Sequence, residues 1–290
     1  MRMLISTHKA FVLWEDGKVT LLHEGAGIYY GITWDDHRIF LVARGNQPSR
    51  MLVFDNTMYP LGTLPYKHLG PMGDGPHQAL FWDGILYVTN TQRNRVECWD
   101  GTDIFFLSWG PTDGDHDHVN SIWREPTAGT FWIAEHRRNK RPKRVRVLNP
   151  DHSLLSTIEM DPDSLSLPPS HVGMHNVYVE NGILYTLGPS LVIGYDLDTQ
   201  EVEEIELEGV VRYKHYLRAL ARSPEHFYIG ASNFAPRKER ELGASKILVT
   251  NARFEVQEEI HMDYEWGQIM EIRLIDGPDL AHNGLPCPLV

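Results

Sequence analysis

The sequence repeats with a period of roughly 40–50 residues, and each repeat holds four short stretches typical of β-strands. In one repeat these stretches read HQALFWDG, ILYVTNT, RVECWDG and IFFLSWG. Turn dipeptides such as Asp-Gly and Asn-Gly separate the runs, and helical periodicity is nearly absent. Repeats of this length and strand content are typical of the blades of a β-propeller. The first strands of five repeats are anchored at Tyr29, His77, His118, His175 and Leu217.

The two ends of the chain account for a sixth repeat. One strand remains at the C-terminal end, within Gly267–Gly277, and three remain at the N-terminus: MLISTH, AFVLWED and KVTLLHE. One plus three strands complete a blade, and this closes the ring without leaving open sheet edges between the ends. We therefore predict an all-β, six-bladed β-propeller that forms a single domain over residues 1–290. The alternative, a β protein of two domains, does not explain this strand count.

Charge and composition narrow the class of partner. The net charge of −12 argues against nucleic acid or an anionic membrane as the main partner and leaves a small-molecule substrate. The N-terminal segment MRMLISTHKAFVLWEDG lacks the apolar run of a signal peptide, and no segment approaches the roughly 20 apolar residues of a membrane span. The two cysteines lie far apart and predict no disulfide framework. We expect a cytoplasmic protein.

Histidines recur at the start of the first strands. We interpret His77, His118 and His175 as occupying one repeat position, because each opens a first strand. First strands line the central channel of a propeller, so the three imidazoles should converge at its mouth. His215 precedes Leu217 by two residues, and strand alternation predicts that it points to the same side. The pattern predicts a cluster of four imidazoles.

Convergent imidazoles favour a transition metal. Histidine is neutral near physiological pH and then binds metals through nitrogen. The cluster contains no thiol, which disfavours a cysteine-type zinc site. We expect one divalent transition metal, with Zn, Fe or Mn favoured over Cu and Ni. Candidate carboxylates for orienting the imidazoles are Asp115, Asp117, Glu135 and Glu271.

Loops between second and third strands should open on the same mouth and carry many cationic and amide side chains. A cationic rim on an acidic protein predicts an anionic ligand. Arg218 lies inside a first strand, which favours either a buried ion pair or contact with substrate, and Asn120 is placed to orient a ligand. The rim candidates are Arg44, Asn46, Arg93, Asn94, His136, Arg137, Asn233 and Arg237.

Three side chains are candidates for acid–base catalysis. Tyr29, or its neighbour Tyr30, begins the first channel strand, where a phenol beside a metal serves as an acid–base group unless it only packs. His136 and His215 are further candidates near the mouth. The sequence contains no GxSxG, phosphate-binding glycine loop or HExxH, so a serine hydrolase or a nucleotide enzyme is not supported.

Several segments resemble known propeller families. PHQALFWDGILYVTNTQRNRVECWD resembles an NHL-like blade, and the expected site is similar in layout to peptidyl-α-hydroxyglycine amidating lyase, virginiamycin B lyase-type enzymes and oligogalacturonate lyases. HVNSI with WIAEHR resembles arylsulfotransferase-like propellers. LRALARSPEHFYIGASNFAPRKERE and GQIMEIRLIDGPDL resemble the uncharacterised propeller family DUF4915. These resemblances imply a metal at the channel mouth and redox-neutral chemistry.

Together these observations predict a metal-dependent lyase or hydrolase that acts on a small anionic substrate. A metal at the channel mouth activates a substrate oxygen or a bound water. Two other functions remain open at this point. One is an Fe(II)-dependent oxygenase that uses the same histidines, and the other is a non-catalytic binding module, since fold does not imply function.

Overall fold

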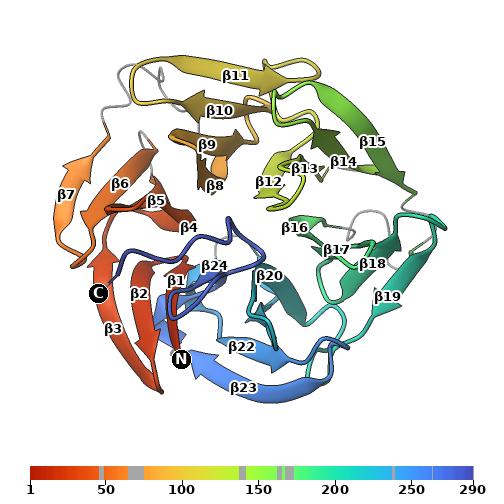
Figure 1. The fold of residues 1–290 in the computed structure, drawn as a ribbon. Coiled ribbons are helices and arrows are strands. Elements are labelled where there is room, and N and C mark those ends of the chain that lie inside the picture. The colour runs from red at the N-terminus through yellow and green to blue at the C-terminus, as the bar shows by residue number, and fades with distance from the viewer. Residues whose placement is uncertain are drawn as a thin grey trace.

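The computed structural model shows a ring of six four-stranded antiparallel sheets, arranged as the blades of a β-propeller (Figure 1). The predicted all-β, six-bladed fold is confirmed. None of the helices in the described part of the chain is long and apolar enough to cross a membrane. The structure describes residues 1–45, 49–64, 75–136, 142–161, 165–166, 173–236, 239–262 and 264–289.

The first three blades follow each other along the chain, and in each the first strand lies nearest the axis of the ring (Figure 1). Blade 1 contains β4 (Ile28–Trp34), β5 (Arg38–Arg44), β6 (Arg50–Asp55) and β7 (Pro60–Thr63). Blade 2 contains β8 (Pro76–Trp82), β9 (Ile85–Asn90), β10 (Arg95–Trp99) and β11 (Ile104–Ser108). Blade 3 contains β12 (Val119–Arg124), β13 (Phe131–Glu135), β14 (Lys143–Leu148) and β15 (Leu154–Met160).

The remaining blades complete the ring. Two short 3₁₀ helices, η2 (Arg240–Leu242) and η3 (Tyr264–Trp266), lie between strands of the C-terminal part. Blade 4 contains β16 (His175–Glu180), β17 (Ile183–Leu187), β18 (Val192–Asp196) and β19 (Val202–Ile205). Blade 5 contains β20 (His215–Arg222), β21 (Phe227–Asn233), β22 (Ser245–Thr250) and β23 (Val256–Met262). Blade 6 contains β24 (Ile269–Leu274), β1 (Arg2–Thr7), β2 (Ala10–Glu15) and β3 (Lys18–Glu24).

The ring closes through blade 6, as the strand count predicted. The C-terminal strand β24 pairs with the N-terminal strand β1 in an antiparallel register in which Met3 lies opposite Leu274 and Ile5 opposite Ile272. This pairing joins the two ends of the chain in one sheet, with the strand order β24-β1-β2-β3. The facing edges of β24 and β1 are therefore hydrogen-bonded to each other, so neither strand is left unpaired where the ring closes.

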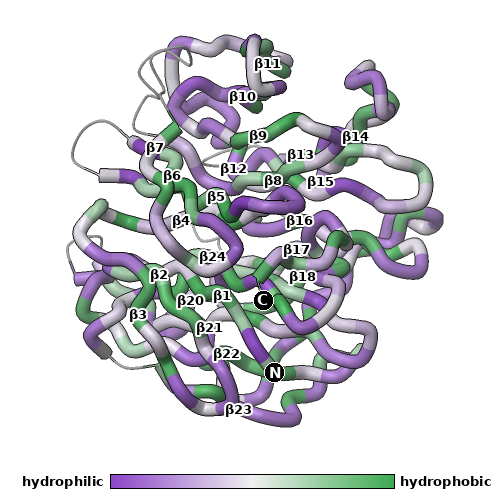
Figure 2. Tube along the Cα trace, turned by 60° about the vertical axis from the view of Figure 1, so that its left-hand side comes forward, coloured by the Kyte–Doolittle hydropathy of each residue, from purple (hydrophilic) through white to green (hydrophobic). Residues whose placement is uncertain are grey.

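Tight turns explain how such short strands are connected. Blades 2 and 4 join their first two strands through the dipeptides Asp83–Gly84 and Asn181–Gly182, and all four residues have positive φ. Two consecutive positive φ angles define the type I′ turn, whose twist matches that of the flanking strands. Hydrophobic stretches lie along the strands and hydrophilic ones mostly at the turns, as Figure 2 shows.

The hydrophobic core lies between neighbouring blades instead of at one centre. Five clusters of buried side chains fill the spaces between adjacent sheets, and the largest joins blades 3, 4 and 5. Trp34 and Trp123 are almost fully buried in these layers. Apolar surface buried between blades stabilises the ring by about 25 cal/mol per Å². Mostly polar side chains line the channel along the ring axis.

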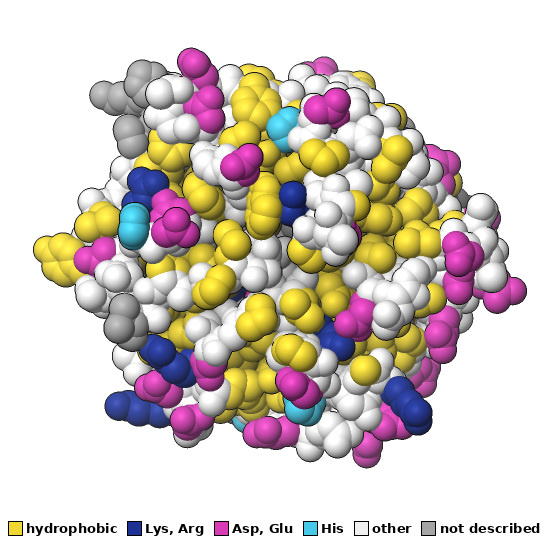
Figure 3. Space-filling view, in the orientation of Figure 1, with side chains coloured by type: hydrophobic (Ala, Val, Ile, Leu, Met, Phe, Trp, Pro, Cys, Tyr) yellow, Lys and Arg dark blue, Asp and Glu magenta, His cyan; other side chains and the backbone are white. Residues whose placement is uncertain are grey.

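The C-terminal segment, residues 278–289, crosses one end of the channel, and we call it the strap (Figure 1). The indole N–H groups of Trp34 and Trp123 donate to the strap carbonyls of Leu285 and Leu280, at 3.3 and 2.9 Å. In the same view the space-filling surface shows the centre of this face filled with side chains (Figure 3). The strap therefore covers one end of the channel, and His77, His118 and His175 lie toward the other.

Candidate functional site

Each inner strand is irregular at the same height in the channel. A β-bulge leaves extra residues without a partner and re-aims side chains. Around the ring the bulges therefore turn a circle of side chains toward the axis. The pairing slips between Tyr29 and Ile32, Pro76 and Ala79, Val119 and Ser121, His175 and Tyr178, and Arg218 and Leu220, and in blade 6 it passes over Met270.

A cavity of about 480 Å³ opens at the channel end away from the strap. Its lining is polar and rich in nitrogen-bearing side chains, with two aromatic rings and few aliphatic groups. One acid, Asp115, is among the lining residues that the structure describes. The nitrogen-bearing and aromatic members are His8, His77, His118, His136, His175, Arg44, Arg218, Gln92, Gln268, Tyr30 and Tyr216.

Four of these histidines form a continuous row along the wall made by blades 2, 3 and 4. Ring centroids are 5.4 Å apart for His77 and His118, 5.1 Å for His118 and His136, and 5.5 Å for His136 and His175. All three contacts are edge-to-face, with interplanar angles between 73° and 80°. We call these four side chains the imidazole row.

Hydrogen bonds fix the orientation of two rings in the row. His77 donates from Nδ1 to the carbonyl of Gly75 at 3.0 Å, because a carbonyl oxygen only accepts. His118 Nδ1 contacts both carboxylate oxygens of Asp115, at 2.9 and 3.0 Å. In His77 the Nε2 atom is then the nitrogen without a described hydrogen-bond partner. A carbonyl or carboxylate on the second nitrogen is the usual support of a metal-binding histidine.

The fourth ring of the row, His175, is held from two sides. Its Nε2 lies 2.5 Å from the Tyr216 hydroxyl, and its Nδ1 lies 3.3 Å from Asn120 Nδ2. Asn120 also donates to the carbonyl of Met174 at 2.7 Å, which fixes its amide. Asn120, predicted to orient a ligand, therefore positions a histidine of the row.

Burial keeps two of the imidazoles neutral. Desolvation lowers the pKa of His77 and of His175 well below its ordinary value. The positive charges of Arg218, and for His77 also of Arg44, act in the same direction. Neutral imidazoles keep a lone pair for a metal or a proton.

The loop that carries His118 rests on a buried polar scaffold. Asp117 exchanges two hydrogen bonds with Asn94, one from the Asn94 amide to its carboxylate and one from its own backbone N–H, both 3.0 Å long. Arg144 bridges Asp117 and Glu135. His118 itself has a φ of 55°, which is uncommon for a non-glycine residue and occurs often at functional sites. The predicted supports Asp117 and Glu135 thus act on the loop instead of on the imidazole.

Below the row, the channel narrows to a polar chamber of about 20 Å³, room for about one water molecule. Glu271 lies in its wall and is buried; Gln78 and Asn176 donate to it at 3.4 and 3.5 Å, and Arg273 pairs with it at 2.9 Å. Burial raises the pKa of Glu271 to about 7. The predicted support Glu271 therefore contacts amides and a guanidinium below the row.

The three aligned histidines are offset in the structure. His77 and His175 line both the cavity and the chamber, and in blade 3 Asn120 lines the chamber while His118 lies two residues nearer the mouth. His118 precedes β12, whereas His77 and His175 lie within their strands. The three still reach one wall, with His136 as the fourth member.

Two predicted catalytic residues point away from the cavity. Tyr29 is fully buried between blades, where its hydroxyl contacts His23 Nδ1 at 2.8 Å, and Tyr30 lines the cavity. His215 accepts a hydrogen bond from the backbone of Val211 at 2.9 Å, on the opposite side of β20 from the cavity-lining Tyr216. The predicted alternation was offset by one residue in both strands, and such an offset reverses every side chain.

The rim residues divide into three groups. Arg44 and His136 line the cavity, as does Arg218 from within its inner strand. Arg93 and Asn233 are not among its lining residues, and Asn94 supports the loop of His118. Asn46, Arg137 and Arg237 lie outside the described residues.

Sequence reasoning missed His8 and Tyr216. His8 lies in the loop between β1 and β2, which are the second and third strands of blade 6. The loop rule applied to the other blades would have found it there. Predicting that Tyr216 lines the cavity would have required the correct side-chain alternation of β20.

No group of three or more His, Cys, Asp or Glu side chains in the described ranges is arranged to hold a metal ion as it stands. The four imidazoles follow one another around the wall, and each ring contacts the next. The described residues therefore offer nitrogen donors for a metal, but these donors do not converge on one point.

Comparison with known proteins shows the fold alone. No family model matches the sequence, and neither does any curated protein. A nidogen/laminin complex contains a chain 14% identical, with a TM-score of 0.64, over 94% of this chain and 97% of that one. A protein of unknown function from Bacteroides caccae is 12% identical, with the same TM-score and the same coverage. The chain thus shares the six-bladed propeller fold with both.

Proposed function

We propose that this protein is a metal-dependent lyase or hydrolase that acts on a small anionic molecule in the cavity. The imidazole row carries the proposal. It offers four nitrogen-bearing rings on one wall, and the Nδ1 atoms of His77 and His118 already contact a carbonyl and a carboxylate. One divalent transition metal (Zn, Fe or Mn) suits an all-nitrogen set of donors. When bound, it supplies Lewis acidity to a water or a substrate oxygen.

The residues of the row have distinct roles in this proposal. His77 and His118 would be the first ligands, because their Nδ1 atoms contact a carbonyl and a carboxylate, the usual support of a metal-binding imidazole. His136 or His175 would complete the set, provided that its ring turned about its side-chain torsions toward the other two. Tyr216, 2.5 Å from His175, is placed to hold or deliver a proton there.

Redox-neutral chemistry is favoured over an Fe(II)-dependent oxygenase by the resemblance of blade 2 to NHL-like propellers of the amidating-lyase type. A non-catalytic binding module is the second candidate, since a nidogen chain in a complex with laminin shares the fold. A row of four imidazoles, two of them buried and neutral, beside a cavity of about 480 Å³ favours the enzyme, because protein-binding faces do not require such a row.

The test is the metal content of the purified protein. Wild-type protein, purified without added metal and then incubated with Zn²⁺, Fe²⁺ or Mn²⁺, is dialysed and measured by plasma mass spectrometry. We expect an equimolar amount of one metal, and His118→Ala should lose most of it. His215→Ala is the matched control, because His215 lies outside the cavity, and it should retain the metal. Metal-free wild type, or equal content in all three proteins, would contradict the proposal.

A further inference from the structure

Two arginines reach one wall of the cavity from different blades. Arg44 ends β5 in blade 1, and Arg218 lies in the inner strand β20 of blade 5. Their guanidinium carbons lie 5.8 and 6.0 Å from the centroid of the same ring, that of Tyr30. Arg218 also lies 5.4 Å from the ring of Tyr216. The two cations therefore share an aromatic platform on the side of the cavity formed by blades 5, 6 and 1.

Neither cation has a carboxylate partner among the described residues. The Arg218 side chain donates to the thioether of Met270 at 3.3 Å, and a thioether is a weak acceptor. The Arg44 guanidinium makes no hydrogen bond with a described residue. Arg144 and Arg273 differ, because each contacts a carboxylate at close range.

The carboxylate in the described lining of the cavity is not placed to neutralise them. Asp115 holds Nδ1 of His118 with both oxygens, on the other wall. His77, next to Tyr30 with ring centroids 4.7 Å apart, is kept neutral by burial. The arginine side of the cavity thus carries two positive charges without a described counter-charge, although the chain has a net charge of −12.

A guanidinium presents five N–H donors in a planar fork that matches the oxygens of a carboxylate or a phosphate. Leaving such donors without acceptors in a half-buried cavity is unfavourable, so a bound oxyanion would stabilise the site. Aromatic faces beneath the two cations hold them in place and leave their N–H edges for a ligand.

We infer that Arg44 and Arg218 together anchor a carboxylate or phosphate group of the substrate on the Tyr30 side of the cavity. The ligand is then oriented, with its anionic end toward blades 5, 6 and 1 and its other functional group toward the imidazole row of blades 2, 3 and 4. The orientation rests on the proposed function, whereas the anion anchor does not.

The test measures anion binding by titration calorimetry at low salt. The probes are inorganic phosphate, malonate, succinate and, as the uncharged analogue, malonamide. The variants are Arg44→Gln and Arg218→Gln. The control is Arg38→Gln, because Arg38 pairs with Asp35 and does not line the cavity. Metal content is measured on every variant and on His118→Ala.

We expect at least one anion to bind wild type while malonamide does not, and each cavity variant to lose about tenfold or more in affinity. Arg38→Gln should bind as wild type does. The stronger of malonate and phosphate identifies the oxyanion. Equal affinity in the cavity variants, or binding of malonamide as tight as malonate, overturns the anchor. Failure of the anchor with metal retained leaves the proposed function standing, and loss of metal in His118→Ala with anion binding retained separates the two sites.

Discussion

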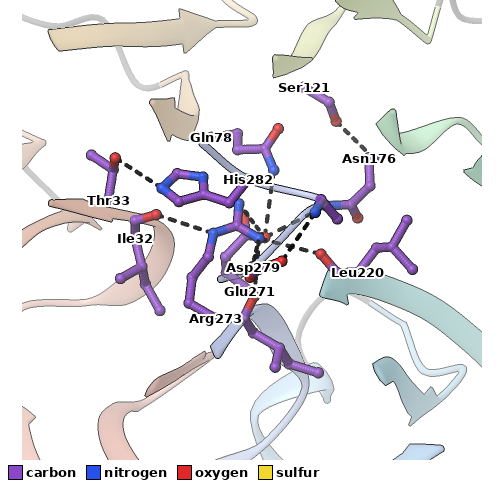
Figure 4. Close-up of polar contacts among 12 residues, drawn as sticks. Ile32, Thr33, Gln78, Ser121, Asn176, Leu220, Glu271, Arg273, Asp279 and His282 are labelled. Atoms are coloured by element: carbon purple, nitrogen blue, oxygen red, sulfur yellow. Dashed lines mark hydrogen bonds and ion pairs between the residues drawn. The ribbon is translucent and has the colours of Figure 1, made fainter. Parts of the chain in front are cut away.

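The two ends of the same channel are built in opposite ways. At the strap end, Arg273 is fully buried and donates to the backbone carbonyls of Ile32, Leu220 and Ile272, and it pairs with Glu271 (Figure 4). At the cavity end, Arg218 has a sulfur atom and two aromatic faces as neighbours. Arg273 is thus surrounded by carbonyl and carboxylate oxygens, although its Nη2 makes only an ion-pair contact, whereas Arg218 has no carbonyl or carboxylate partner among the described residues.

The acids and histidines follow the same division. Asp279 in the strap accepts from the backbone N–H groups of Arg222, Leu274 and Ala281, and His282 Nε2 lies 3.0 Å from the Thr33 hydroxyl (Figure 4). These groups link strands of several blades. At the cavity end, Nε2 of His77 has no described hydrogen-bond partner. Internal satisfaction indicates a structural role, and unused bonding capacity indicates a binding role.

Asp279→Ala, at the strap end of the channel, is expected to have the largest effect on stability and none on ligand binding at the cavity end. The change removes a buried acceptor of three backbone N–H groups and a carboxylate 3.9 Å from Arg273. We expect a loss of about 3–5 kcal/mol in the free energy of unfolding and a drop in Tm on the order of 10 °C. Calorimetry and urea unfolding measure both. Asp276→Ala is the exposed control and should change stability by less than about 0.5 kcal/mol. Reduced metal or anion binding by folded Asp279→Ala would break the comparison.

A second effect concerns Glu271, which lies between the ends. Burial raises its pKa from 4.5 to about 7, so between these values the folded state keeps a proton that the unfolded state has lost. Wild-type stability should therefore fall as pH rises through this window, by up to roughly 3 kcal/mol at ~1.4 kcal/mol per pKa unit. Glu271→Gln cannot ionise, so its stability relative to wild type should increase from pH 4.5 to 7. Parallel stability–pH curves for the two proteins would show that Glu271 ionises normally.

The smallest effect is expected at Gly173, beside the imidazole row. A Cβ there would lie 3.3 Å from His136 Cε1 and 3.5 Å from His175 Nε2. Gly173→Ala should change stability by less than about 1 kcal/mol but weaken metal binding roughly tenfold, because it displaces the rings. Gly277→Ala, where a Cβ meets nothing within 4 Å, is the control. Unchanged metal affinity in Gly173→Ala, measured by competition with a chelator, would exclude a metal beside these two rings.

Almost all of the fold could be predicted from the sequence. Strand runs, Asp-Gly turns and the one-plus-three strand count are local signals, and ring closure between β24 and β1 follows from them. The site was harder, because bulges shift the alternation of every inner strand by a residue and sequence does not mark them. Hence the choice between Tyr29 and Tyr30 stayed open, and His215 was assigned to the cavity in place of Tyr216. His136 was found because a loop position does not depend on alternation, although the same rule was not applied to His8.

The strap network was not predicted at all. Asp279 and His282 lie in a C-terminal segment without strand periodicity, and their partners belong to blades 1, 5 and 6, so only the folded chain brings them together. Arg218 could be recognised as an unusual charge within a strand, but sequence could not decide between an ion pair and a ligand contact. The described structure shows no ion pair for it, which favours the ligand.

We propose that the cavity end binds ligands and that the strap end holds the ring together. A crystal structure of protein soaked with Zn²⁺ and malonate tests it most directly, with anomalous data collected on both sides of the zinc absorption edge. The account predicts an anomalous peak among the rings of His77, His118 and their neighbours in the row, and malonate density on Arg44 and Arg218. A well-ordered cavity with neither peak nor density at saturating concentrations, or zinc bound only on the outer surface, would contradict it.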